Sequence, residues 1–146
     1  MTTARMLTIA TVSLGIGFGT VLAQLANNAP KPGPSCSAPA RTMARLEMLF
    51  GTARSHGSPI SDEEWHSFLD TEVTPRFPAG LTVLRGPGQW RGKDGRLTRE
   101  QSNILVVWYE PSNRAEAGIE AIRSAYKERF DQDSVMRVDS VSCVSF

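Results

Sequence analysis

Two different spacings of apolar side chains follow one another in the first half of the folded region. In ARLEMLFG, residues 44–51, apolar and polar positions alternate, which is typical of a strand. Ser61 and Glu64 then form a capping box that predicts the start of a helix. Its apolar positions recur at helical spacing: Trp65, Phe68, Leu69 and Val73. Pro75 disfavours helical geometry in the preceding residue, so this helix is expected to end near Thr74.

The second half of the region repeats the strand and helix patterns in a different order. LTVLR predicts a strand from Leu81, and the Asp-Gly pair of GKDG, residues 92–95, predicts a hairpin turn. NILVVWYE, residues 103–110, is almost continuously apolar, as in a central strand that is covered on both faces. PSNRAE opens a second helix, whose buried stripe is expected to contain Ile119, Ile122, Tyr126 and Phe130. A last strand, from Ser134, closes the chain.

The order strand, helix, strand, strand, helix, strand predicts an α+β domain of the ferredoxin-like type. In this split βαβ (βαββαβ) pattern, a four-stranded antiparallel sheet carries both helices on one face. The strands then lie in the spatial order 4-1-3-2. Two helices cover only one face, so the other apolar face has to meet something else.

The chain begins with a targeting pattern rather than with the folded domain. After Arg5 an uncharged, apolar run ends in small residues, which is typical of a secretory signal peptide. We therefore expect a signal peptide at residues 1–23, a Pro/Ala/Ser-rich linker at 24–42 and a single domain at 43–146. The expected location is the periplasm or the cell exterior. An uncleaved segment that anchors the protein in a membrane is the alternative.

The charge balance excludes one class of partner. The chain has 16 Lys and Arg against 15 Asp and Glu. Cleavage after residue 23 would remove Arg5. The number of basic residues would then be 16 − 1 = 15, equal to the number of acidic residues, and the formal charge would be zero. Nucleic-acid binders usually carry a basic surface, so none is expected as a partner. Neutrality is compatible with a small ligand or a protein partner.

The two cysteines predict a cross-link. Cys36 precedes the first strand and Cys143 ends the fourth, and the ferredoxin-like topology brings these positions to the same end of the sheet. Export would place them where disulfides persist, so we expect a Cys36–Cys143 bridge. Two free buried thiols are the alternative. Two cysteines and two histidines without close spacing do not predict a metal site.

Several segments resemble a known bacterial family across residues 43–146. They are MLFGTAR, SDEEWHSFLDTEVTPRFPAGLTVL, GQWRG, REQS, IEAIRSAYKERF and SVMRVDS. Together they are similar to the family catalogued as domain of unknown function 3574, with TPRFPAGLTV and GQW as the most specific pieces. The resemblance implies an exported or envelope protein, and it supplies no catalytic residues.

The stretch TPRFPAGLTVLRGPGQW divides into two features. Residues 74–80 end the helix and turn the chain, with Phe77 closing the end of the core. We interpret Arg76 as a solvated arginine at the carboxyl end of the helix, and anion binding is the alternative. Trp90 lies nine residues beyond Leu81, about 30 Å along a straight strand, so it cannot share a pocket with Arg76 unless GPG bends the strand sharply.

The hairpin end carries the candidate ligand site. With the turn at Asp-Gly, Trp90 is expected opposite Arg99 and Gln89 opposite Glu100, unless GPG introduces a bulge. A tryptophan among such groups can hold a small polar or anionic ligand, and Tyr109 joins these four as a candidate. The simpler alternative is a solvated hairpin whose tryptophan covers the edge of the core.

Two main functions, and beside them a purely structural role, remain open at this stage. The chain has no nucleophile elbow and no phosphate-binding glycine motif, since GIGFG, which has some of the right letters, lies in the targeting segment, so no catalytic set or cofactor is expected. The first function is a non-catalytic envelope module that binds a small molecule or a protein. The second is a small enzyme of the dimeric α/β-barrel kind with a sheet-lined cavity. In both, the second sheet face is expected to form a homodimer or a pocket.

Overall fold

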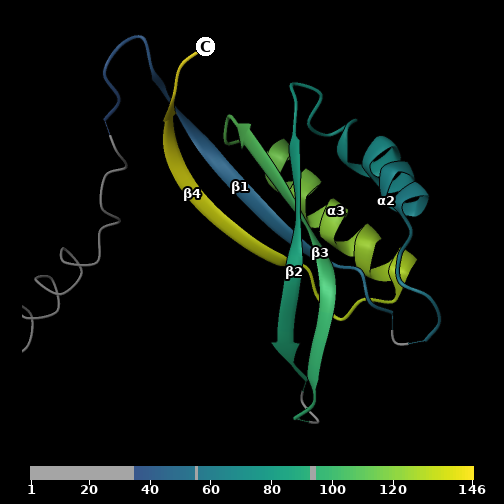
Figure 1. The fold of residues 1–146 in the computed structure, drawn as a ribbon. Coiled ribbons are helices and arrows are strands. Elements are labelled where there is room, and N and C mark those ends of the chain that lie inside the picture. The colour runs from purple at the N-terminus through teal and green to yellow at the C-terminus, as the bar shows by residue number, and fades with distance from the viewer. Residues whose placement is uncertain (1–34, 55, 93–94) are drawn as a thin grey trace, which may run out of the picture. The chain divides into compact units, whose positions relative to one another are not determined.

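The computed structural model describes residues 35–54, 56–92 and 95–146. The predicted signal peptide and most of the predicted linker lie outside these residues. Four strands and two helical segments follow in the predicted order (Figure 1). They are β1 (Arg41–Gly51), α2 (Asp62–Phe68) with the π-helical η1 (Leu69–Val73), β2 (Thr82–Arg91), β3 (Leu97–Tyr109), α3 (Asn113–Phe130) and β4 (Met136–Val144). No helix among the described residues is long and apolar enough to cross a membrane.

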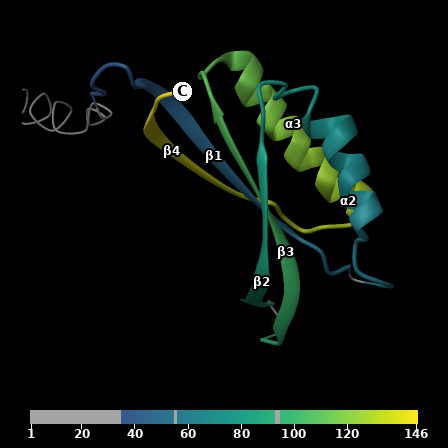
Figure 2. The same ribbon diagram turned by 45° about the horizontal axis from the view of Figure 1, so that its top comes forward.

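The strands form one antiparallel sheet in the order β2-β3-β1-β4, which confirms the predicted topology. Both α2 and α3 lie on the same face, as Figure 2 shows from the side. β1 begins at Arg41, ahead of the domain boundary expected at residue 43. The far ends of β2 and β3 continue as a hairpin beyond the end of β1, whose last pair joins Gly51 to Ser102.

The first helix begins and ends where predicted, but its last turn is π-helical. The side chain of Ser61 accepts from the Glu64 N–H and the Glu64 side chain accepts from the Ser61 N–H, so the capping box is present. The last turn widens into η1, where the Thr74 N–H donates to Leu69 O. The Thr71 hydroxyl donates to Ser67 O, and such back-bonding competes with the regular helical ladder.

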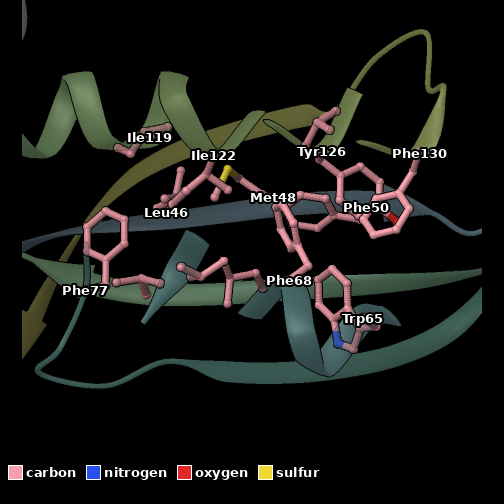
Figure 3. Close-up of a cluster of buried hydrophobic side chains, with 14 of the residues drawn as sticks. Leu46, Met48, Phe50, Trp65, Phe68, Phe77, Ile119, Ile122, Tyr126 and Phe130 are labelled. Carbon is pink, nitrogen blue, oxygen red and sulfur yellow. The ribbon is translucent and has the colours of Figure 1, made fainter. Parts of the chain in front are cut away.

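The core lies between the sheet and the helices, and aromatic rings dominate it (Figure 3). Its central ring, Phe50, lies 4.6 Å from Tyr126 and 5.2 Å from Trp65, measured between ring centroids. Phe68 and Phe130 complete the cluster, and each aromatic pair adds about 0.5–1.5 kcal/mol beyond its burial. The helix stripes predicted from spacing are all buried except for Leu69, which is partly buried.

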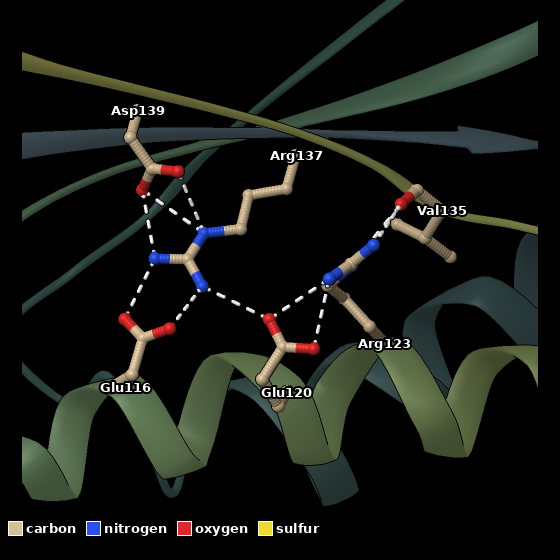
Figure 4. A network of polar contacts seen from close by, with 6 residues as sticks. All are labelled: Glu116, Glu120, Arg123, Val135, Arg137 and Asp139. Carbon is tan, nitrogen blue, oxygen red and sulfur yellow. Dashed lines mark hydrogen bonds and ion pairs between the residues drawn. The ribbon is translucent and has the colours of Figure 1, made fainter.

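Ion pairs join β4 to α3 (Figure 4). Arg137 on β4 contacts Glu116 and Glu120 on α3 and also Asp139 on its own strand. These carboxylates raise the pKa of Arg137 above its ordinary range, and its side chain is only 17% exposed. β4 therefore turns charged residues toward the helix layer.

The predicted disulfide is present. Cys36 and Cys143 are joined with their Cα atoms 5.5 Å apart, and Cys143 is the β4 residue paired with Thr42. A turn in which the Ala40 N–H donates to Ser37 O leads from the bridge into β1. The bridge thus fastens the start of the domain to its last strand.

Candidate functional site

The face of the sheet opposite the helices carries apolar side chains from all four strands. In strands, alternate residues share a face, and pairing places one of these residues on each strand in a single row. The row is Leu84, Ile104, Leu49 and Met136, on β2, β3, β1 and β4. Val106 and Val138 lie on the next row and extend it. We call this surface the open face.

The described loops do not cover the open face. Met136 is 59% exposed and Val138 is 43% exposed, and Leu84 and Trp108 are exposed as well. Val106, near the middle of the sheet, is buried by its neighbours. A contiguous exposed apolar surface of this kind is typical of a binding or association site.

β4 shows the open face most clearly, because its polarity is inverted. A strand with one covered face normally turns its apolar residues toward the covering layer. Here Arg137 and Asp139 face α3, whereas Met136 and Val138 face away from it. The alternation is visible in the sequence SVMRVDS, but only the structure shows which set faces the helices.

One ion pair interrupts the apolar surface. Arg45 lies 2.7 Å from Glu47 on the same face of β1, and its guanidinium lies over the Trp108 ring, 5.6 Å from the centroid. The tryptophan and the two charges together form one end of the open face. Trp90 and Glu100 lie at its other end, on the projecting hairpin.

Glu100 is held in place by two donors. Its carboxylate accepts from the Ala53 N–H at 2.7 Å and from Trp90 Nε1 at 2.8 Å. A Cβ atom on Gly51 would lie 2.8 Å from both carboxylate oxygens, so glycine leaves the space that the carboxylate occupies. The arrangement fixes the Trp90 ring against the hairpin while leaving it half exposed.

The predicted register of the hairpin is wrong by one residue. Gln89 pairs with Arg99 and Trp90 pairs with Thr98. The Gly92 N–H donates to Arg96 O, so three residues of the sequence separate this pair, and Gly95 has a positive φ of 78°. Trp90 and Arg99 therefore do not share a face of the hairpin, since a shift by one residue moves a side chain to the other face.

The five candidate residues consequently lie in three places. Trp90 and Glu100 share the open face, while Arg99 donates to Gln89 at 2.9 Å on the opposite face of the hairpin. An open hollow of about 520 Å³ runs along the hairpin, lined by Pro87, Gly88, Gln89, Arg99, Glu100 and Gln101. Tyr109 is at the far end of β3, where its ring meets Phe77 at 5.7 Å and burial raises its pKa.

Metal binding finds no support among the residues that the structure describes. They contain no group of three His, Cys, Asp or Glu side chains that could hold an ion. Both described cysteines are taken by the disulfide.

Comparison with known proteins shows the family of the domain. The family model described as "Protein of unknown function (DUF3574)" matches residues 45–146. The chain belongs to this family. No curated protein matches it.

Solved structures similar to this DUF3574 protein share its fold at low sequence identity. A phage SAM lyase in complex with S-methyl-5'-thioadenosine is 13% identical, with a TM-score of 0.56 over 71% of this chain and 90% of that chain. A phage SAM lyase in its apo state is also 13% identical, with a TM-score of 0.54 over 77% of this chain and 97% of that chain. CutA from Synechococcus elongatus PCC7942 is 10% identical, with a TM-score of 0.45 over 69% of this chain and 80% of that chain. At this identity the likeness to the two lyase structures shows the fold alone.

Proposed function

We propose that this DUF3574 protein is an exported, non-catalytic binding module that works as a homodimer, in which two copies pack through their open faces. The inverted polarity of β4 carries the proposal. Met136 and Val138 point away from the core of their own chain, and burial of a Val or Met side chain contributes about 1.5–3 kcal/mol. A second copy supplies the covering layer that the helices do not.

The size of the open face suits a stable interface. With strands about 4.8 Å apart and about 3.3 Å per residue, four strands of about ten residues offer roughly 600 Å² of flat area. Projecting side chains expose more surface than a flat sheet does. A stable complex buries about 800 Å² of accessible surface on each partner, which is the same order.

The charges on the open face are self-complementary. In a two-fold dimer, a residue that contacts a second residue of the other copy is contacted by it in return. Arg45 and Glu47 lie two residues apart on β1, so Arg45 of one copy can meet Glu47 of the second. One axis through this region satisfies both charges of each copy.

The hairpin end is the proposed ligand contact of the module. Gln89, Trp90, Arg99 and Glu100 line or border its hollow, and all four remain candidates for a small polar ligand. Tyr109 is too far along β3 to belong to that contact.

Sedimentation equilibrium of two matched variants tests the dimer. Val138 and Val141 lie on the same strand with similar exposure, 43% and 48%, but on opposite faces. We expect the wild type and Val141→Arg to be dimers and Val138→Arg to be a monomer that retains its circular dichroism spectrum. A monomeric wild type, or two variants that behave alike, would contradict the proposal.

Export is tested on the same preparations. A protein processed by a bacterial host should have the intact mass of a chain that begins at Gln24 and whose two cysteines are joined in a disulfide. An uncut chain in the membrane fraction would favour the anchored alternative instead.

A further inference from the structure

A second hollow lies at the opposite end of the sheet from the hairpin. β2 begins at Thr82, opposite Val106, so the last residues of β3 have no β2 neighbour. The chain at 75–80 and the first turns of α3 form the walls there. The hollow has a volume of about 570 Å³, which is within the usual range of about 300–1,000 Å³ for ligand sites. We call it the end groove.

The floor of the end groove is apolar. Phe77 is buried against the Tyr109 ring, and Met43 is also buried. The wall on α3 consists of small residues, among them Ala117 and Gly118. The groove stays open because these side chains are too short to fill it.

The rim of the end groove is cationic. Arg41, Arg76 and Arg114 line it, and Glu110 is the one carboxylate among the lining residues, so they carry 3 − 1 = +2. Arg41 pairs with Glu110 and Arg76 pairs with Glu72, which lies outside the lining, and the amino end of α3 adds a partial positive charge.

The arginines differ in how they are held. Arg76 donates to the Glu72 carboxylate at 3.0 Å, and its aliphatic part lies over Gly118, where a Cβ atom would be 3.6 Å from Arg76 Cδ. Arg41 and Glu110 form a long pair at 3.5 Å, with both side chains largely exposed. Within the described part of the chain, Arg114 forms no ion pair. Arg76 is thus fixed, whereas Arg114 and Arg41 remain able to reach an anion.

We propose that the end groove binds a small organic anion, namely a carboxylate or phosphate on an apolar body. The apolar body lies on Phe77 and Tyr109, and the anionic group meets Arg114 and Arg41 at the rim. Arginine suits this role because its planar fork matches carboxylate and phosphate oxygens. The groove shares Arg41, Met43 and Trp108 with one end of the open face, but ligand binding and oligomeric state are measured separately, so this proposal and the dimer can fail separately.

Two pairs of probes test the charge requirement. They are titrated into the purified protein in the form that a bacterial host produces. 2-Naphthoate and octanoate carry the carboxylate, and 2-naphthamide and octanamide are their uncharged matches. Binding is measured by calorimetry and located by amide chemical shifts. We expect at least one acid to bind about tenfold more tightly than its amide, with shifts at Gly80 and Gly118.

Three variants locate the site independently of stability. Ala117→Trp should abolish binding by filling the groove, whereas Ser124→Trp, exposed on the same helix outside the groove, should not. Arg114→Gln, at an exposed position, should weaken acid binding about fivefold and leave amide binding unchanged. Absence of binding by both acids, equal binding of acid and amide, or shifts confined to β4 would overturn the proposal.

Discussion

Removal of the Cys36–Cys143 bridge should destabilise the domain mainly through its unfolded state. In the folded protein the bridge holds a short lead-in segment, because Cys36 precedes β1 and the sheet pairing of Thr42 with Cys143 persists without it. In the unfolded chain it closes a loop across the whole domain. The variant to examine is Cys36→Ser/Cys143→Ser.

The size of the effect follows from the sequence separation of 107. In the chain-entropy model, closing such a loop removes about 16 cal/mol/K from the unfolded chain, or about 4.8 kcal/mol at 25 °C. Native domains are stable by only about 5–15 kcal/mol. Loss of the bridge should therefore remove a large share of the free energy of unfolding, while the fold itself remains.

Urea unfolding followed by circular dichroism measures this loss. We expect the free energy of unfolding to fall by about 4–5 kcal/mol and its dependence on urea to become steeper, because an unlinked chain exposes more surface. Reduction of the wild type should give the same curve as the variant, and reductant should not affect the variant. A loss of less than about 1 kcal/mol with an unchanged slope would refute the entropic reasoning.

Other contacts give further expected outcomes. Arg137→Met should lower stability by about 1–2 kcal/mol at neutral pH. Arg137 lowers the pKa of Glu116 from 4.5, so the stability that this ion pair contributes is present above that pH and is lost on acidification. The melting temperatures of the two proteins should therefore converge from pH 6 to about pH 3. A constant difference between the melting temperatures would count against the ion pair. Tyr126→Phe removes the hydroxyl that donates to Gly51 O at 2.9 Å and should cost about 1 kcal/mol by urea unfolding, whereas no change would mean that water replaces it. Gly51→Ala should displace the Glu100 carboxylate and cost about 1 kcal/mol, and the cost should vanish in a Glu100→Ala background.

Local patterns were sufficient to predict the elements and the topology. The capping box at Ser61 and the apolar stripe of α3 act over a few residues, so they can be read directly from the chain. The disulfide followed because the topology brings Cys36 and Cys143 to one end of the sheet. The π-helical turn at 69–73 was not predicted, since the amide of Thr74 bonds one residue further back than regular spacing allows.

The candidate site depended on distances that local patterns do not contain. A one-residue difference in the hairpin loop placed Trp90 opposite Thr98 and separated it from Arg99. Tyr109 has the right chemistry for a ligand contact, but it lies at the other end of β3 from Glu100. The end groove gathers Arg41, residues 75–80 and Arg114, which are far apart in the chain.

The amino-acid sequence by itself determined the strands, the helices, their order and the cross-link, because turn chemistry and apolar periodicity act between near neighbours. It also determined that the chain has more apolar strand surface than two helices can cover. Only the tertiary structure decided which side of β4 faces outward, since Met136 and Arg137 alternate equally well in either orientation until α3 supplies Glu116 and Glu120. Ion pairing with the helix fixes that orientation and leaves the apolar residues of β4 on the open face.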